Sequence, residues 1–308
     1  MREDFSQTLR QILEPGQPFA HRLLPALSNL VPEELQVLQR AWPVTPDERR
    51  RQIARALLQL NEDNPDLYFR EAFLLLLDDP DEEVRAAAID GLGDDQSGDL
   101  LERLLALVAT EPAPAVRGQA LLALGQFLYH IETTDFLGDY RERLLRVLLD
   151  IHHDPQSPLE ARRRALESAA YACAATAVEE AIARAYADPE RAMRASAVHA
   201  MGHHMGERWR PAVERELASP DPEMRYEAAH ACGEFADPEL VPLLAPLVED
   251  DDHEVKLQAI WALGEIGGVA ARRLLRRCLD QADDDTVAAV REALQTLDFY
   301  EDPGRVAL

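Results

Sequence analysis

A short pattern that returns about every 31 residues constrains the fold of this 308-residue chain more than any other feature. The full pattern has an acidic or proline-containing turn, an apolar residue, a basic residue, then alanine beside an apolar residue, and finally an apolar residue before glycine. The copy at Ala161 lacks the glycine, and the copy at Ala289 is degraded. The apolar residues that open the copies are Val84, Val116, Ala161, Met193, Met224, Val255 and Ala289. A period in this range is typical of solenoid proteins.

The intervals between copies are nearly uniform. Met193, Met224 and Val255 are spaced by 31 residues, and three of the other intervals are 32 or 34. The interval from Val116 to Ala161 is 45, which predicts an insertion within residues 129–150.

Within a copy the apolar residues fall at positions 0, +4, +5 and +8, counted from the opening apolar residue. This spacing places them in one stripe along a helix of 3.6 residues per turn. A second helix fills the rest of each period, for example residues 239–249 and 270–279. A single hairpin cannot bury both of its stripes, so the hairpins must stack. We therefore predict an all-α fold, an α-α superhelix of stacked antiparallel helix hairpins.

The two ends of the chain depart from the repeat. Residues 1–65 carry helical segments without the period, and we expect an irregular helical N-terminal cap there. The repeats are predicted to occupy residues 66–298. Residues 299–308 contain Pro303-Gly304 and have no periodicity, so we expect a C-terminal tail.

Charge and composition exclude several classes of ligand. The formal net charge is −25, and the basic residues are spread along the chain, so neither nucleic acid nor an anionic membrane surface is an expected partner. Apolar runs such as residues 73–77 are too short to span a bilayer, and the N-terminus lacks a signal-peptide pattern. Cys173, Cys232 and Cys278 are expected to be buried free thiols. We expect a cytoplasmic protein.

The pattern D-x-x-V-R-x-x-A-(V/I)-x-A-L-G resembles the short HEAT-like repeats of the phycobilin-lyase type. The resemblance implies a solenoid whose second helices, which carry the Val-Arg pair, line the concave face. The basic residues that follow the opening apolar position are expected to form a ladder paired with turn acids of their own or the next repeat. They are Arg85, Arg117, Arg162, Arg194, Arg225 and Lys256.

Positions +2, +3, +6 and +10 should then face the concave groove, and in three neighbouring repeats they gather aromatic, histidine and acidic residues. This predicted site consists of His199, His203, Tyr226, Glu227, His230, Glu234, Gln258, Trp261 and Glu265. Tyrosine and tryptophan are favoured at binding hot spots. The sequence thus favours a non-catalytic scaffold that binds a protein partner with basic or amphipathic segments. Alternatively, Tyr226 and Trp261 only fill space between helices.

The same residues suggest a second hypothesis, a metal site. His199 and His203 are four residues apart on one helix, and His230 and Glu234 repeat that spacing on the next, which is a ligand set for a transition metal. Deoxyhypusine hydroxylase, an iron enzyme of HEAT-like fold, uses adjacent His-Glu pairs, but this chain has Tyr226-Glu227 at that place. A bilin-lyase-type enzyme or chaperone is the related alternative.

Other chemistry has little support in the sequence. The chain has no Gly-rich phosphate loop, no G-x-S-x-G elbow and no C-x-x-C pair. A HEAT-like glycosylase would need a basic groove, whereas Arg163, Arg164 and Arg291 are outnumbered by carboxylates on the groove positions. We therefore expect no catalytic residues, no cofactor and no resident metal.

Overall fold

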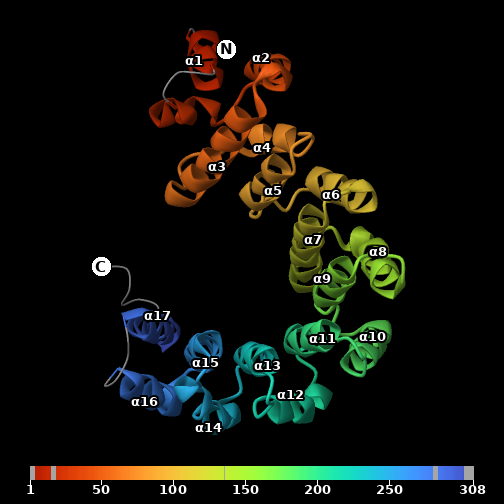
Figure 1. Ribbon diagram of the computed structural model, residues 1–308, viewed down its shortest axis with the longest axis vertical. Helices are drawn as coiled ribbons and strands as arrows, with labels where there is room; N and C mark the ends of the chain where they lie inside the picture. The colour runs from red at the N-terminus through yellow and green to blue at the C-terminus, as the bar shows by residue number, and fades with distance from the viewer. Residues whose placement is uncertain (1–3, 15–18, 135, 280–283, 302–308) are drawn as a thin grey trace. The chain divides into compact units, whose positions relative to one another are not determined.

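The computed structural model describes residues 4–14, 19–134, 136–279 and 284–301, and within these ranges the chain is helical with no strand (Figure 1). The all-α prediction is confirmed. The chain divides into two compact units, the first extending to Ile131 and the second beginning at Gly138, with the few residues between them shared. The predicted boundary between a cap and the repeats at residue 65 does not coincide with this division and stays a prediction.

The first unit contains the non-repetitive helices and the first repeats. Its helices are α1 (Phe5–Leu13), η1 (His21–Leu27), α2 (Pro32–Ala41), η2 (Trp42–Val44), α3 (Asp47–Asp63), α4 (Arg70–Leu76), α5 (Glu82–Gly91), α6 (Gly98–Thr110) and most of α7 (Pro114–Thr134). The segment η1 is a 3₁₀ helix with Pro25 inside it, because proline cannot donate the backbone hydrogen bond that an α-helix needs. The Trp42 indole donates to the buried Asp79 carboxylate at 2.6 Å, which ties η2 to the turn before α5.

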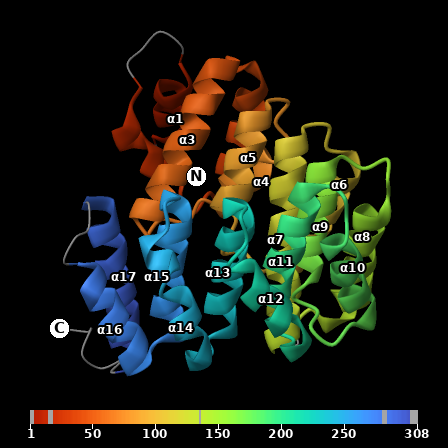
Figure 2. The same cartoon turned by 60° about the horizontal axis from the view of Figure 1, so that its bottom comes forward.

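The second unit is a double row of helices. It contains η3 (Gly138–Tyr140), α8 (Arg141–His153), α9 (Leu159–Ala169), α10 (Thr176–Tyr186), α11 (Arg191–His204), η4 (Glu207–Trp209), α12 (Arg210–Glu216), α13 (Pro222–Phe235), η5 (Pro238–Leu240), α14 (Val241–Leu244), η6 (Leu247–Glu249), α15 (His253–Ile266), α16 (Gly268–Cys278) and α17 (Asp284–Glu301). Helices α9, α11, α13, α15 and α17 form an inner row, and α8, α10, α12, α14 and α16 form an outer row (Figures 1 and 2).

The insertion predicted within residues 129–150 is found where the sequence places it. Helix α7 is extended to Thr134, and the 3₁₀ turn η3 follows before α8. The second helix predicted over 239–249 is instead two 3₁₀ turns around the short helix α14, since Pro242 and Pro246 interrupt it. Helix α17 continues to Glu301, three residues into the predicted tail. The rest of that tail lies outside the described residues.

The predicted buried stripe is confirmed in all repeats but the last. In α15, for example, Val255, Ala259, Ile260 and Leu263 are fully buried. In α17 the buried residues are Thr286, Val290, Ala293 and Leu297, at 0, +4, +7 and +11 from Thr286. Ala293 lies against Gly264 as Ala262, seven residues after Val255, lies against Gly233, so the opening position is Thr286 and not Ala289. Thr286 lies 31 residues after Val255, so the last repeat follows at the usual interval of 31 residues and not at the predicted interval of 34.

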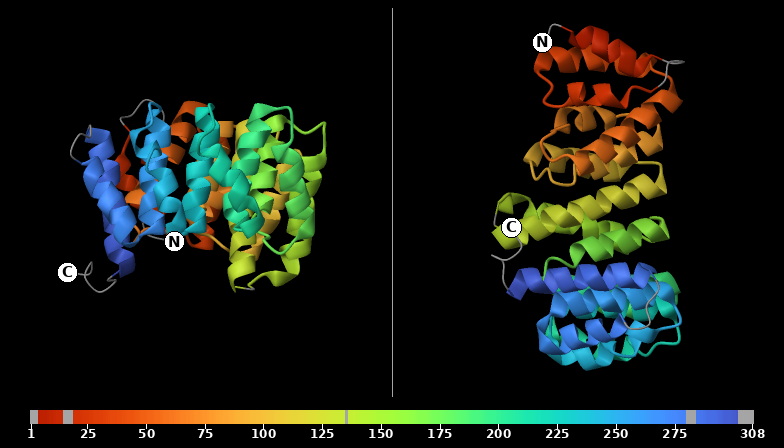
Figure 3. Two further views of the ribbon diagram at one scale, coloured as in Figure 1. Left: turned by 90° about the horizontal axis from the view of Figure 1, so that it is seen from below. Right: turned by 90° about the vertical axis from the view of Figure 1, so that its left-hand side faces the viewer.

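Glycine sets the distance between neighbouring inner helices. A Cβ added to Gly202 would lie 2.8 Å from the Ala231 Cα atom, and one added to Gly264 would lie 3.0 Å from the Ala293 Cα atom. The same relation joins Gly233 to the backbone of the following helix. Real Cβ atoms do not approach backbone so closely, so these helices touch only because both residues in each contact are small. The parallel course of the inner helices is visible in Figure 3.

The recurring basic residues stabilise turns in two ways. Arg85 forms a two-bond pair with Glu111 at 2.6 and 2.8 Å, and Arg225 does the same with Asp250 at 2.7 and 2.8 Å. The ladder prediction is confirmed for these two arginines, whose acids lie in the turn before the next repeat's helix.

The other arginines of the series differ from the prediction. Arg117, Arg162 and Arg194 donate instead to backbone carbonyl groups in the turns and helix ends that precede their own helices. Such carbonyls have no backbone N–H partner within a helix, and the guanidinium groups donate hydrogen bonds to them.

Two expectations from composition can be compared with the structure. Among the described residues, no helix combines the length and the apolar character that crossing a bilayer requires. Of the three free cysteines only Cys232 is buried. The expectation of buried thiols was wrong for Cys173, which is exposed because it lies in the turn after α9, and Cys278 is partly exposed.

We expect the Arg85–Glu111 pair to make the stability of the first unit depend on pH. Burial alone would raise the pKa of Glu111, but the hydrogen bonds and charge of Arg85, with the Ala113 N–H, bring it below its ordinary 4.5. A carboxyl group whose pKa is lower in the folded than in the unfolded state stabilises the fold when the pH is above the unfolded-state pKa. This contribution is lost as the pH falls through the folded-state pKa. Glu111→Gln should cost about 3 kcal/mol at neutral pH.

Urea denaturation of wild type and Glu111→Gln at intervals from about pH 7 to about pH 3 checks this, because the gap in unfolding free energy should close below about pH 4.5. Glu62→Gln, an exposed change in the same unit, is the control and should stay within about 0.5 kcal/mol of wild type. A gap that is constant across this range would contradict the expectation.

Candidate functional site

The predicted site lies on three consecutive inner helices of the second unit. All nine of its residues are partly exposed, in contrast with the fully buried stripe on the opposite side of the same helices. His199 and His203 lie on α11, Trp261, Gln258 and Glu265 lie on α15, and the others lie on α13. We call the side of the inner row that faces away from the outer row the inner face. Whether these residues bind a partner stays a prediction.

Three of the residues form a histidine cluster, made of His199, His203 and His230. The His199 ring stacks on the His230 ring with centroids 4.6 Å apart, and His203 stands edge-on to both, at 4.5 Å from His199 and 5.6 Å from His230. One ring nitrogen from each histidine lies within 4.8 Å of the others. The close helix contact between Gly202 and Ala231 is what lets side chains of α11 and α13 meet in this way.

Aromatic rings continue the cluster on both sides. Tyr171, just after α9, stacks on His203 with centroids 4.4 Å apart, and Trp261 stacks on His230 at 5.1 Å. A continuous run of rings therefore crosses four repeats. Tyr171 was not among the predicted site residues, although its place at +10, in the same row as His203, was a signal that could have included it.

Carboxylates surround the cluster. Glu227 Oε2 lies 2.9 Å from His199 Nδ1, and Glu234 Oε1 lies 3.7 Å from His230 Nε2. No ring contact joins Tyr226 to the cluster within the part of the chain that the structure describes, and Gln258 makes no hydrogen bond to it there. The structure thus brings together six of the nine predicted residues by direct contact and places Tyr226, Gln258 and Glu265 at the margin.

Burial and neighbouring charges separate the three histidines electrostatically. Burial, together with the positive charge that the neighbouring histidines carry when protonated, lowers the pKa of His203 and of His230 to about 3, so both are neutral at pH 7. Burial also opposes protonation of His199, but the hydrogen bond and charge of Glu227 outweigh it and raise the pKa of His199. The cluster therefore contains two neutral rings beside one that is stabilised in its charged form.

An open hollow of about 470 Å³ adjoins the cluster between α13, α15 and α17. It is lined by Trp261, Glu234 and Glu265, with Ile266 and Leu297 among its apolar residues. Burial raises the pKa of the Glu234 and Glu265 carboxyl groups. The hollow thus combines an aromatic ring, two carboxylates and an apolar floor.

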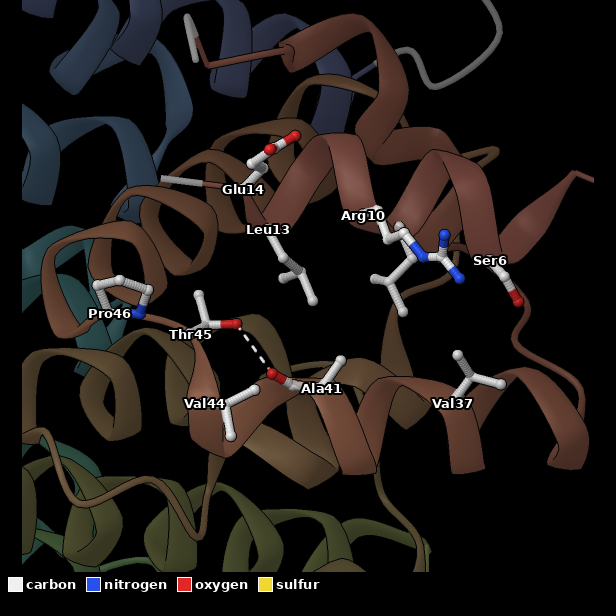
Figure 4. Close-up of a pocket in the computed structure, with 10 residues that line it drawn as sticks. Ser6, Arg10, Leu13, Glu14, Val37, Ala41, Val44, Thr45 and Pro46 are labelled. Carbon is white, nitrogen blue, oxygen red and sulfur yellow. Dashed lines mark hydrogen bonds between the residues drawn. The ribbon is translucent and has the colours of Figure 1, made fainter. Parts of the chain in front are cut away.

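A second hollow, of about 520 Å³, lies in the first unit between α1, α2 and η2 (Figure 4). Its walls are mostly apolar, with Leu13 of α1 on one side and Val37, Ala41 and Val44 on the other. The Thr45 hydroxyl donates to the Ala41 carbonyl at 3.0 Å beside it. This hollow was not predicted from the sequence, which indicated only a cap in this region, because no repeat period relates these residues.

A family profile described as HEAT repeats matches residues 70–159 and 210–295, which together make up more than half of the chain. The chain therefore belongs to the HEAT-repeat family. The resemblance found in the repeat pattern is confirmed at this level, and the narrower phycobilin-lyase type stays a prediction.

Several solved structures are similar to the chain, whereas no curated protein sequence matches it. YibA of E. coli shares 18% identity over 80% of this chain and 96% of its own, with a TM-score of 0.43. Human deoxyhypusine hydroxylase in complex with glycerol shares 20% identity over 86% of this chain and 96% of its own, with a TM-score of 0.36. Kap95p bound to RanGDP shares 14% identity over 97% of this chain and 46% of its own, with a TM-score of 0.48.

We expect Gly233→Ala to displace Trp261 and destabilise the second unit. The new Cβ would lie 2.4 Å from Trp261 Cζ3 and 3.1 Å from the Ala262 Cα atom. Overpacking of this kind costs about 1–3 kcal/mol, more than the roughly 1 kcal/mol that alanine gains over glycine in a helix. Urea denaturation and the emission spectrum of the tryptophans measure the two effects.

Gly98→Ala provides the matched control, because its Cβ would make only an ordinary contact of 3.5 Å at the start of α6. It should not lower the unfolding free energy, and it should leave the emission spectrum unchanged. Equal behaviour of the two variants would show that the close contact at Gly233 is not a constraint.

Proposed function

We propose that the chain is a non-catalytic scaffold that binds a protein partner on the inner face of the second unit. The observation that carries the proposal is the hollow beside the histidine cluster, which is lined by Trp261 together with Glu234 and Glu265. Stacked helical repeats are suited to this role because they present one extended surface along their inner row.

The chemistry of the hollow favours a basic side chain of the partner. A lysine or arginine that enters it would meet the face of an aromatic ring and pair with a carboxylate at the same time. The methylene groups of such a side chain would pack on Ile266 and Leu297, as long basic side chains do on apolar surface. Because Glu234 and Glu265 are only partly exposed, the pairing would be less weakened by water than one on an open surface.

The excess of negative charge supports the same class of partner. The chain carries 57 acidic and 32 basic residues, so its long-range field attracts a basic segment and repels phosphate groups. The partner we propose is therefore a protein with basic or amphipathic segments, as the sequence suggested. The hollow is the place of contact that we propose for it.

We expect Trp261→Ala to weaken capture of the partner. Proteins captured by the full chain from its native host are identified by mass spectrometry, and the binding of a recovered partner is then measured with purified components. A hot-spot tryptophan is worth about 2 kcal/mol or more, so Trp261→Ala should weaken binding more than tenfold. Glu234→Gln with Glu265→Gln should weaken it and reduce its dependence on salt.

Tyr68→Ala is the matched control, an exposed aromatic residue of the first unit at 55% exposure. It should leave binding unchanged, while Tyr226→Ala tests how far the interface extends beyond the hollow. A set of partners that binds Trp261→Ala and wild type equally well would remove the inner face from the proposed function.

A further inference from the structure

The histidine cluster has a geometry that the binding of a basic partner does not explain. Three imidazole rings from two helices converge so that one nitrogen of each lies within 4.8 Å of the others. The hollow that we propose for a basic side chain is lined by Trp261, Glu234 and Glu265 and not by these three rings. The cluster therefore calls for a ligand of a different chemistry.

Two nitrogens of the cluster lack any hydrogen-bond partner among the described residues. They are the Nδ1 atoms of His203 and of His230, and both are buried. Leaving buried polar atoms unpaired is unfavourable, and native structures rarely do so without a reason. Two such atoms in adjacent rings indicate a shared ligand that accepts electron pairs.

The other nitrogens of the rings are already occupied or close to polar groups. His199 Nδ1 is hydrogen-bonded to Glu227, His203 Nε2 lies 3.4 Å from the Tyr171 hydroxyl, and His230 Nε2 lies 3.7 Å from Glu234. The His199 ring is thus oriented by its hydrogen bond to Glu227, and the other two rings each have a polar group near one nitrogen, with the Glu167 backbone also acting on His203. This is how proteins orient histidines that ligate a metal, with the outer group fixing the tautomer and the ring plane.

We propose that His199, His203 and His230 bind one divalent transition-metal ion of the Zn²⁺ or Co²⁺ class. His199 Nε2 and the two unpaired Nδ1 atoms would supply the ligands, and Glu227 would be a positioning residue. Three imidazoles leave a fourth position for water in tetrahedral coordination. Nitrogen ligands favour this class of metal over Ca²⁺ or Mg²⁺.

Binding requires the rings to close in and to turn. Bonds of about 2.0 Å place tetrahedral ligand atoms about 3.3 Å apart, closer than the 4.8 Å limit in the cluster. A metal ion lies in the plane of each imidazole that ligates it, whereas the His199 and His230 rings are stacked face to face beside Trp261, so at least one of the two rings must turn out of the stack. Metal binding is therefore expected to change the surroundings of Trp261, which makes its fluorescence a direct readout.

The test uses the untagged full chain after treatment with a chelator and titration with Co²⁺ and then Zn²⁺. We expect one ion per chain, visible absorption bands of tetrahedral Co²⁺ that Zn²⁺ removes, a higher melting temperature with the ion, and a fluorescence change that is absent in Trp261→Phe. His203→Ala or His230→Ala should abolish stoichiometric binding. Glu227→Gln should weaken it about 10- to 100-fold, as expected for a group that orients a ligand.

His253→Ala, at an exposed histidine of the same unit, is the control and should bind as wild type does. If an alanine variant fails to fold by circular dichroism, His203→Gln and His230→Gln replace it, since they keep the volume without the imidazole. Absence of stoichiometric binding to wild type would overturn the proposal, and so would binding that survives in both the His203 and the His230 variants.

Discussion

The contact between a glycine of one inner helix and the alanine of the next is the constraint on which the second unit depends. Gly202, Gly233 and Gly264 each lie against the backbone 29 residues further along the chain, at Ala231, Ala262 and Ala293. Any side chain at these glycines would hold the helices apart. Because the same pair recurs, the inner helices keep one spacing, and the side chains at +6 and +10 of successive helices come within stacking distance.

That spacing explains why the candidate site is made of rings. Histidine, tyrosine and tryptophan at equivalent positions of adjacent helices can stack face to face only where the backbones approach closely. The run from Tyr171 through the histidine cluster to Trp261 is therefore a consequence of the packing between repeats. Its chemistry depends on what lies around it, with Glu227 favouring the charged form of one histidine while burial keeps the other two neutral.

Much of this could be predicted from the sequence because the signal was periodic. The buried stripe, the stacking of hairpins and the neighbourhood of His199, His203, His230 and Trp261 all follow from one repeat length and one helical period. The register of the last repeat was predicted wrongly, because Thr286 is a polar residue in an apolar position and the nearby Ala289 matched the pattern better.

The features that could not be predicted from the sequence are those that do not recur with the repeat. The orientation of each ring, which decides that two Nδ1 atoms remain unpaired, depends on rotamers and not on spacing. The hollow of Figure 4 depends on the 3₁₀ turn η2, and its residues share no recurring pattern. Arg85 and Arg225 also donate to backbone carbonyls, and they differ from the other three arginines only in the acid that their local turns add.

The constant offset between each glycine and its alanine has a consequence for how such a chain can change in length. Since every one of these junctions is chemically the same, a whole period of 31 residues can be duplicated or removed while each remaining helix still finds a compatible neighbour. The inner face then grows or shrinks by one helix at a time. The residues at +6 and +10 do not take part in the glycine–alanine contacts, so they can be substituted to give a different inner face while the packing of the helices stays the same.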